Sequence, residues 1–232
     1  EAGNSYFAVA LDRETGTGIW TTPIAPVILE SWSSPAIDIE HQTLIVASGN
    51  TIAALDTTTG EQIWSHTLSS TIVNASPVIT DDLGDRDRIL ITNYSFGGFG
   101  NAQLVCINTN PFDAEINPYE PGEIVWAKAL GADSSGNTPA YQNGRIYLAT
   151  ATDGSSSRGT VRCYDITGDT QPTSPIWSFT NPINAGFFGG VAIANGHVYA
   201  SSYTFSGLQN SANTVKLDKR TGELVWSVPT NR

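Results

Sequence analysis

The residues best suited to chemistry in this sequence are the carboxylates of one acidic stretch, residues 81–88, which reads DDLGDRDR. Calcium takes six to eight hard oxygen ligands, and acidic residues alternating around a glycine can supply them. Asp81, Asp85 and Asp87 are therefore candidate Ca²⁺ ligands. The alternative is a solvated, salt-bridged turn, because Leu83 stands where a ligand is expected and the two arginines can neutralise the carboxylates.

Other groups that could do chemistry are scattered. His41, His66 and His197 lie far apart with no metal-ligand spacing, and each is expected to be a turn or packing residue. The sequence holds no Gly-x-Ser-x-Gly elbow, phosphate-binding loop or His-Glu-x-x-His string. We therefore assign no catalytic and no cofactor-binding residue, and the sequence leans against an enzyme.

A repeated turn organises the chain around these residues. In residues 54–64, Asp56 can hydrogen-bond to nearby turn amides, Gly60 closes the turn, and Trp64 begins the next apolar run. The same string, in stricter or looser form, precedes five tryptophans: Trp20, Trp64, Trp126, Trp177 and Trp226. The copies are roughly 45–60 residues apart, a period that marks solenoids and propellers.

Between tryptophans the same order of segments returns: a small-residue entry, a β-branched run, and the turn with its tryptophan. Each unit is thus expected to hold four short antiparallel strands, called A to D, which form a propeller blade. The predicted fold is an all-β propeller of four complete blades and a half-blade. The expected divisions are 1–20 for the half-blade, then 21–64, 65–126, 127–177 and 178–232. The half-blade lacks strands A and B, so we expect a ring completed by missing or partner sequence.

The turn pattern Ala-x-Asp-x-x-Thr-Gly-x-x-x-Trp, matched at every position by residues 54–64, resembles the tryptophan-docking motif of the PQQ-like, or quinoprotein-type, β-propellers. PQQ is pyrroloquinoline quinone. The resemblance implies that the five motif tryptophans dock between adjacent blades and have a structural role. It also implies that a PQQ enzyme would carry two adjacent cysteines. Cys106 and Cys163 instead occupy one repeat position in separate blades, so we expect buried free thiols and no PQQ.

Aromatic residues gather on long loops that share one face of the predicted propeller. These are the loops between strands B and C, and the segments that lead from strand D into the next strand A. The binding-loop candidates are Trp32, Tyr94, Phe96, Phe99, Phe187, Phe188, Tyr203 and Phe205. Aromatics on glycine-rich loops over a rigid scaffold favour a binding surface. The alternative is that they plug the mouth of the channel.

Composition limits the classes of partner that the chain is expected to bind. The formal net charge is −11 and charged residues make up only 14% of the chain, which argues against nucleic acid as a partner. No apolar run is long enough to span a membrane. Abundant Ser, Thr and Asn and only two cysteines suit an extracytoplasmic protein in the periplasm, at the cell surface or in secretion.

We therefore expect a non-catalytic extracytoplasmic binding or scaffold module with a protein or glycan partner. Two alternatives are kept, since fold does not determine function. One is a fragment of a PQQ-dependent dehydrogenase. The other is a structural surface or filament subunit that self-associates through its incomplete blade.

Overall fold

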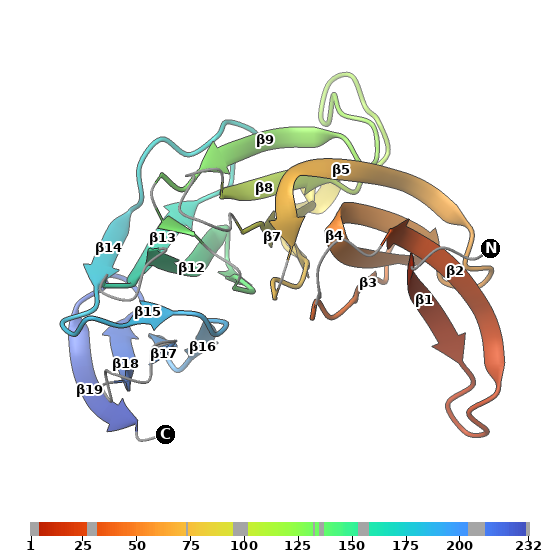
Figure 1. The fold of residues 1–232 in the computed structure, drawn as a ribbon. Coiled ribbons are helices and arrows are strands. Elements are labelled where there is room, and N and C mark those ends of the chain that lie inside the picture. The colour runs from red at the N-terminus through yellow and green to blue at the C-terminus, as the bar shows by residue number, and fades with distance from the viewer. Residues whose placement is uncertain are drawn as a thin grey trace.

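Small antiparallel sheets, each formed by consecutive strands, follow one another along the chain and stand side by side in an arc (Figure 1). The computed structural model describes residues 5–26, 32–72, 74–94, 102–131, 133–134, 137–152, 158–203 and 212–230. We number the sheets blades 1 to 5 in chain order. Both ends of the arc are open, with β1 and β2 at one end and β19 at the other. This arrangement confirms the predicted propeller of four blades and a half-blade.

The strands of each blade are as follows. Blade 1 is the pair β1 (Ser5–Leu11) and β2 (Gly18–Pro26), and blade 2 holds β3 (Ala36–Asp38), β4 (Thr43–Asp56) and β5 (Gln62–Ile72). Blade 3 holds β6 (Val78–Ile79), β7 (Arg88–Thr92), β8 (Gln103–Asn108) and β9 (Ile124–Ala129). Blade 4 holds β10 (Asp133–Ser134), β11 (Ala140–Gln142), β12 (Arg145–Thr152), β13 (Thr160–Asp165) and β14 (Trp177–Thr180). Blade 5 holds β15 (Gly186–Phe187), β16 (Ala192–Ala194), β17 (His197–Tyr203), β18 (Ala212–Asp218) and β19 (Leu224–Thr230).

In blade 2 a single element, β4, supplies both strand B and strand C. β4 doubles back at Gly49, whose φ of 59° suits glycine, so its two ends lie side by side. The backbone N–H and the hydroxyl of Thr57 both donate to the carbonyl of Gln42, at 3.1 and 3.0 Å. The last strand, β5, begins just before Trp64 and continues to Ile72.

The motif turn forms because the aspartate binds the amides that follow it. Asp56 Oδ1 accepts hydrogen bonds from the backbone N–H of Thr59 at 2.7 Å and of Thr58 at 2.8 Å. Both bonds lower the pKa of the Asp56 carboxyl, and the bond from Thr59 has the larger effect. Gly60 then closes the turn at φ 74°. Asp12 and Asp218 make equivalent bonds in blades 1 and 5.

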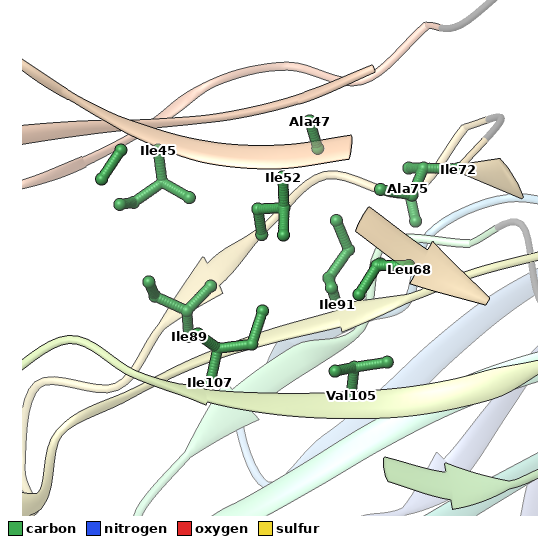
Figure 2. Packing of buried hydrophobic residues seen from close by; sticks show 11 residues of the cluster. Ile45, Ala47, Ile52, Leu68, Ile72, Ala75, Ile89, Ile91, Val105 and Ile107 are labelled. Carbon is green, nitrogen blue, oxygen red and sulfur yellow. The ribbon is translucent and has the colours of Figure 1, made fainter. Parts of the chain in front are cut away.

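The hydrophobic core lies between the blades. Figure 2 shows the cluster between blades 2 and 3, where Ile45 and Ile52 of β4 face Ile89 of β7 and Ile107 of β8. Similar clusters join blades 1 and 2, blades 3 and 4, and blades 4 and 5. A blade buries its two faces only by stacking on its neighbours, so each blade depends on the next for stability.

Motif tryptophans cover the turn glycines of the following blade. A Cβ on Gly60, Gly122 or Gly222 would lie 2.5–2.6 Å from the indole of Trp20, Trp64 or Trp177, respectively. The Trp20 indole N–H donates to the carbonyl of Thr57 at 3.2 Å. The Trp177 indole N–H donates to that of Lys219 at 3.0 Å. Glycine is therefore needed at each of these positions for two reasons. Its φ is positive, and the indole above it leaves no room for a Cβ.

Trp126 is buried in the core between blades 3 and 4, but no described glycine has its Cβ position against this indole. Its indole N–H is buried and has no hydrogen-bond partner among the described residues. The turn between β13 and β14 in blade 4 is longer than those between β4 and β5 and between β18 and β19, and a Cβ on Gly168 would meet no indole. The indoles of Trp20 and Trp177, by contrast, each donate to a turn carbonyl of the next blade.

Candidate functional site

One face of the arc holds the described segments that enter blades 3 to 5, together with the described ends of strand B in these blades. Short bridges tie the two together in three blades. Thr71 bridges Tyr94, Asp133 pairs with Thr152, and Gly186 pairs with Tyr203. We call the surface made by these segments the loop face. Because the same pairing recurs, the described base of the loop face is held by backbone hydrogen bonds.

Asn137 joins three blades beneath the loop face. Its side-chain N–H₂ donates to the carbonyl of Ala149 in blade 4 at 3.0 Å and to the carbonyl of Phe187 in blade 5. The backbone carbonyl of Asn137 accepts a hydrogen bond from the hydroxyl of Thr92 in blade 3 at 2.7 Å. Asn137 is buried, so these bonds form away from water and hold the loop bases rigid.

A pair of buried asparagines supports the loop face in blade 5. The Asn181 and Asn213 side chains exchange two hydrogen bonds, each 3.0 Å from Nδ2 to Oδ1. The Ser202 hydroxyl also donates to Asn213 Oδ1 at 2.6 Å. Sequence reasoning did not identify these asparagines as a network, since their partners lie in other strands. The only local signal is that Asn137 directly precedes the Thr-Pro entry of a strand.

The structure places the aromatic candidates in different environments. Trp32, at the entry to blade 2, is 64% exposed, and Tyr203, at the end of β17, is 45% exposed. Tyr94 and Phe188 are half-buried. Phe187 is fully buried in the core between blades 4 and 5, so the binding-loop hypothesis does not extend to it. Its segment looks like a loop in sequence but pairs with β17 as β15. Phe96, Phe99 and Phe205 lie outside the described residues.

The acidic stretch 81–88 forms a turn that is closed by its own side chains. Asp87 Oδ1 accepts from the Thr80 hydroxyl at 2.6 Å and from the backbone N–H of Leu83 at 3.1 Å. The Asp82 carboxylate accepts from the hydroxyl of Tyr141 in blade 4. Within the described ranges no three acidic, His or Cys side chains are grouped as a metal site. Calcium binding by Asp81, Asp85 and Asp87 stays a prediction.

The two thiols belong to the core. Cys106 lies in β8 and Cys163 in β13, and both are buried and free. Burial raises the pKa of Cys106 to about 12 and that of Cys163 to about 11, so both are protonated at neutral pH. PQQ enzymes of this fold type are expected to hold the quinone against two adjacent cysteines. Thiols in separate blades do not fit that arrangement.

The opposite face carries polar contacts from one blade to the next. Asp38 of blade 2 accepts from the Thr109 hydroxyl of blade 3 at 2.6 Å and lies 2.9 Å from His41 Nδ1. Burial raises the pKa of the Asp38 carboxyl, but the hydrogen bonds from Thr109 and His41 outweigh it and lower the pKa overall. Lys219 Nζ of blade 5 donates to Gln142 of blade 4 at 2.7 Å. These contacts are explained by blade stacking.

The remaining histidines have simple surroundings. His197 Nδ1 lies 2.7 Å from the carbonyl of Asn195 in the turn before β17. His66 is half-buried in β5. The three histidines stay in blades 2 and 5, and the structure brings no pair of them together among the residues described here. None of the helices in the described part is long and apolar enough to cross a bilayer.

Residues 7–111 match the family model PQQ_2, described as outer membrane protein assembly factor BamB. The match covers just under half of the chain and confirms the predicted PQQ-like repeats. A comparison with curated proteins finds no match.

Solved structures give the same fold at low identity. The quinohemoprotein alcohol dehydrogenase of Comamonas testosteroni aligns with a TM-score of 0.60 and 12% identity, over 87% of this chain and 35% of that one. BamB of Moraxella catarrhalis aligns with a TM-score of 0.55 and 15% identity, over 97% of this chain and 68% of that one. The Pan2 WD40 domain of Neurospora crassa aligns with a TM-score of 0.60 and 15% identity, over 98% and 61%. The chain thus spans about a third of the dehydrogenase.

Proposed function

Because the chain is a propeller built from PQQ-like repeats, we propose that it is a non-catalytic extracytoplasmic module that binds a protein partner on its loop face. The observation that carries the proposal is the pairing of exposed aromatics with a rigid base. Trp32 and Tyr203 present large, partly apolar side chains to solvent. The buried Asn181–Asn213 pair holds Ser202, next to Tyr203, and the Ser34 N–H near Trp32 donates to the Ser76 hydroxyl at 2.9 Å. Aromatic side chains on a rigid support lose little entropy on binding, which makes them effective anchors.

Several features support this assignment over catalysis. Within the 81–88 stretch, Asp87 is hydrogen-bonded within its own turn and Asp82 to Tyr141, and the thiols are buried in the core. The family model is described by an assembly factor for outer membrane proteins, which suits both a protein partner and an extracytoplasmic location. A glycan partner would use the same aromatic surface by stacking.

The test replaces both exposed aromatics. Trp32→Ala/Tyr203→Ala is expected to lose the proteins that the immobilised wild-type chain retains from a bacterial periplasmic extract. Ile39→Ala is the matched control, because Ile39 is 85% exposed but lies in the turn between β3 and β4, on the opposite face. It should retain the same proteins as the wild type. Equal retention by all three would contradict a binding role for the loop face.

A PQQ-dependent dehydrogenase fragment is the second candidate, favoured by the fold match to quinohemoprotein alcohol dehydrogenase. The cysteine positions argue against it, since the quinone would lack its adjacent pair. We expect no saturable quenching of tryptophan fluorescence when PQQ is titrated into the chain with excess Ca²⁺. Saturable quenching, together with reduction of a redox dye when ethanol is added, would show a dehydrogenase fragment and contradict the proposed binding module.

A further inference from the structure

Blade 3 carries a long turn between β8 and β9 that is not needed to join these strands. It spans residues 109–123, whereas residues 57–61 and 219–223 are enough to join strands C and D in blades 2 and 5. We call residues 109–123 the blade 3 turn. It extends beyond the ends of β8 and β9 (Figure 1). Long ordered turns on a rigid scaffold are common places for binding, so this turn is a candidate for a second contact.

Buried asparagines hold the blade 3 turn in one shape. Asn108 Nδ2 donates to the backbone carbonyls of Asn110 at 2.7 Å and of Tyr119 at 2.8 Å. Asn117 Nδ2 donates to the backbone carbonyl of Pro111 at 2.8 Å. Asn108 and Asn117 are both fully buried, so these bonds form away from water and fix the backbone around them. A turn that is already ordered loses little entropy when a partner binds.

Two large apolar side chains project from this fixed turn into solvent. Phe112 is 52% exposed and Ile116 is 49% exposed. Phe112 directly precedes Asp113, and Ile116 directly precedes Asn117. Asp113 and Asn117 exchange two backbone hydrogen bonds of 2.8 Å, so both apolar side chains belong to one short hairpin. Apolar side chains on a rigid support are suited to act as anchors in an interface.

The exposure of these side chains does not come from an uncovered blade face. Blade 3 has a described blade on each side, and both neighbours pack on the base of the turn. The Trp64 indole of blade 2 covers Gly122. The Tyr119 ring lies 5.8 Å from the guanidinium of Arg88, which pairs with Asp169 of blade 4. Phe112 and Ile116 are therefore exposed because the turn itself directs them away from the blades.

The charge around the two apolar side chains has one sign. Residues 109–123 contain no lysine or arginine, and their acidic residues are Asp113, Glu115, Glu120 and Glu123. All four are exposed, and none forms an ion pair within the described part of the chain. Asn110 Nδ2 donates to the carbonyl of Asp87 at 3.0 Å, so the acidic stretch 81–88 lies beside this turn. Such a surface attracts and orients a positively charged partner and repels acidic ones.

We propose that the blade 3 turn docks a cationic segment of a partner protein. Phe112 and Ile116 pack on apolar side chains of that segment, and the four carboxylates around them face its lysines and arginines. The turn begins at Thr109, on the face opposite the loop face, so this contact is separate from the partner proposed there. Ile39 belongs to the turn between β3 and β4 of blade 2 and is not part of the contact.

The test is fluorescence anisotropy with labelled synthetic peptides as probes and the full chain as receptor. A peptide of alternating lysine and leucine is expected to bind with a Kd of about 10–100 µM at low salt. Raising NaCl from about 50 to about 300 mM should weaken this binding at least about fivefold, because salt screens exposed charges. Peptides with serine or glutamate in place of every lysine should bind at least about tenfold more weakly than the lysine peptide.

Variants of the chain locate the contact. Phe112→Ser/Ile116→Ser should weaken binding of the lysine peptide at least about tenfold. Glu115→Gln/Glu120→Gln should weaken it and reduce its salt dependence. The matched control is Ile63→Ser/Ile176→Ser, because these side chains are 52% and 44% exposed beside the corresponding turns of blades 2 and 4. It should bind as the wild type does. Melting temperatures should agree within about 2 °C, since all the replaced side chains are exposed.

Several results would overturn the proposal. One is equal binding of the lysine peptide by the wild type and Phe112→Ser/Ile116→Ser, since the turn would then not be the anchor. Another is an equal loss in the control pair, which would show unspecific attraction to the acidic face. Equal binding of the serine peptide would assign the turn to an uncharged partner. No binding of the lysine peptide at about 1 mM would exclude a cationic segment as the partner.

Discussion

Replacing Trp177 by alanine is expected to lower the free energy of unfolding by about 3–5 kcal/mol. The indole is buried between blades 4 and 5, stacks near Tyr147 with ring centroids 5.9 Å apart, and covers Gly222. Its removal leaves a cavity at a blade junction and leaves the Lys219 carbonyl without its indole partner. Urea unfolding followed by tyrosine and tryptophan fluorescence measures the change.

The matched control is Trp226→Ala, because Trp226 has the same place in its repeat but is 38% exposed, with no described blade packed over its indole. In dilute monomer this substitution should cost at most about 1 kcal/mol, since the side chain keeps much of its exposure in the folded state. The account would be wrong if the two variants lost equal stability. In that case the blade junction would not be the source of the stabilisation.

Asp169→Ala is expected to cost about 2–3 kcal/mol, somewhat less than the loss of a fully buried ion pair. Asp169 lies in the long turn of blade 4, and its Oδ1 accepts from Arg88 Nη2 of blade 3 at 2.7 Å. The Arg88 side chain is 3% exposed, so without Asp169 a buried guanidinium charge would lose its counter-ion. It would keep its hydrogen bond to Asn108 Oδ1, at 2.8 Å, and its contact with the Tyr119 ring. Chemical unfolding of the purified variant gives the value.

Two further variants identify the ion pair as the cause. Asp85→Ala removes an exposed carboxylate from the neighbouring turn and should change stability by no more than about 0.5 kcal/mol. The double variant Arg88→Met/Asp169→Ala should be more stable than Asp169→Ala alone, because it removes the unpaired buried charge. A double variant that is less stable than the single would show that Arg88 acts mainly through its other partners.

The blades could be predicted from sequence because their signals are local. An aspartate, a glycine and a tryptophan at fixed spacing specify a turn and the strand that follows it, and β-branched runs specify the strands before it. These residues act within one repeat, so a single sequence reveals them. The inter-blade position of the tryptophans came from the resemblance, and the structure places three of them on turn glycines.

The features that could not be predicted depend on contacts between repeats. The Arg88–Asp169 pair forms only because an insertion in blade 4 reaches across to blade 3, and nothing near either residue indicates the other. Phe187 reads as a loop aromatic, yet its segment pairs with β17 and its ring enters the core. Asn137 shows no functional signal in its own segment, because its three partners come from three blades.

The claim that function resides on the loop face is tested most directly by photo-crosslinking. A benzophenone side chain placed at position 32 or at position 39 gives two proteins that differ only in the face that carries the probe. Irradiation in periplasmic extract should crosslink a partner protein from position 32 and none from position 39. Crosslinks from position 39 alone, or no crosslinks from position 32, would contradict a binding surface made by the loops between the repeats.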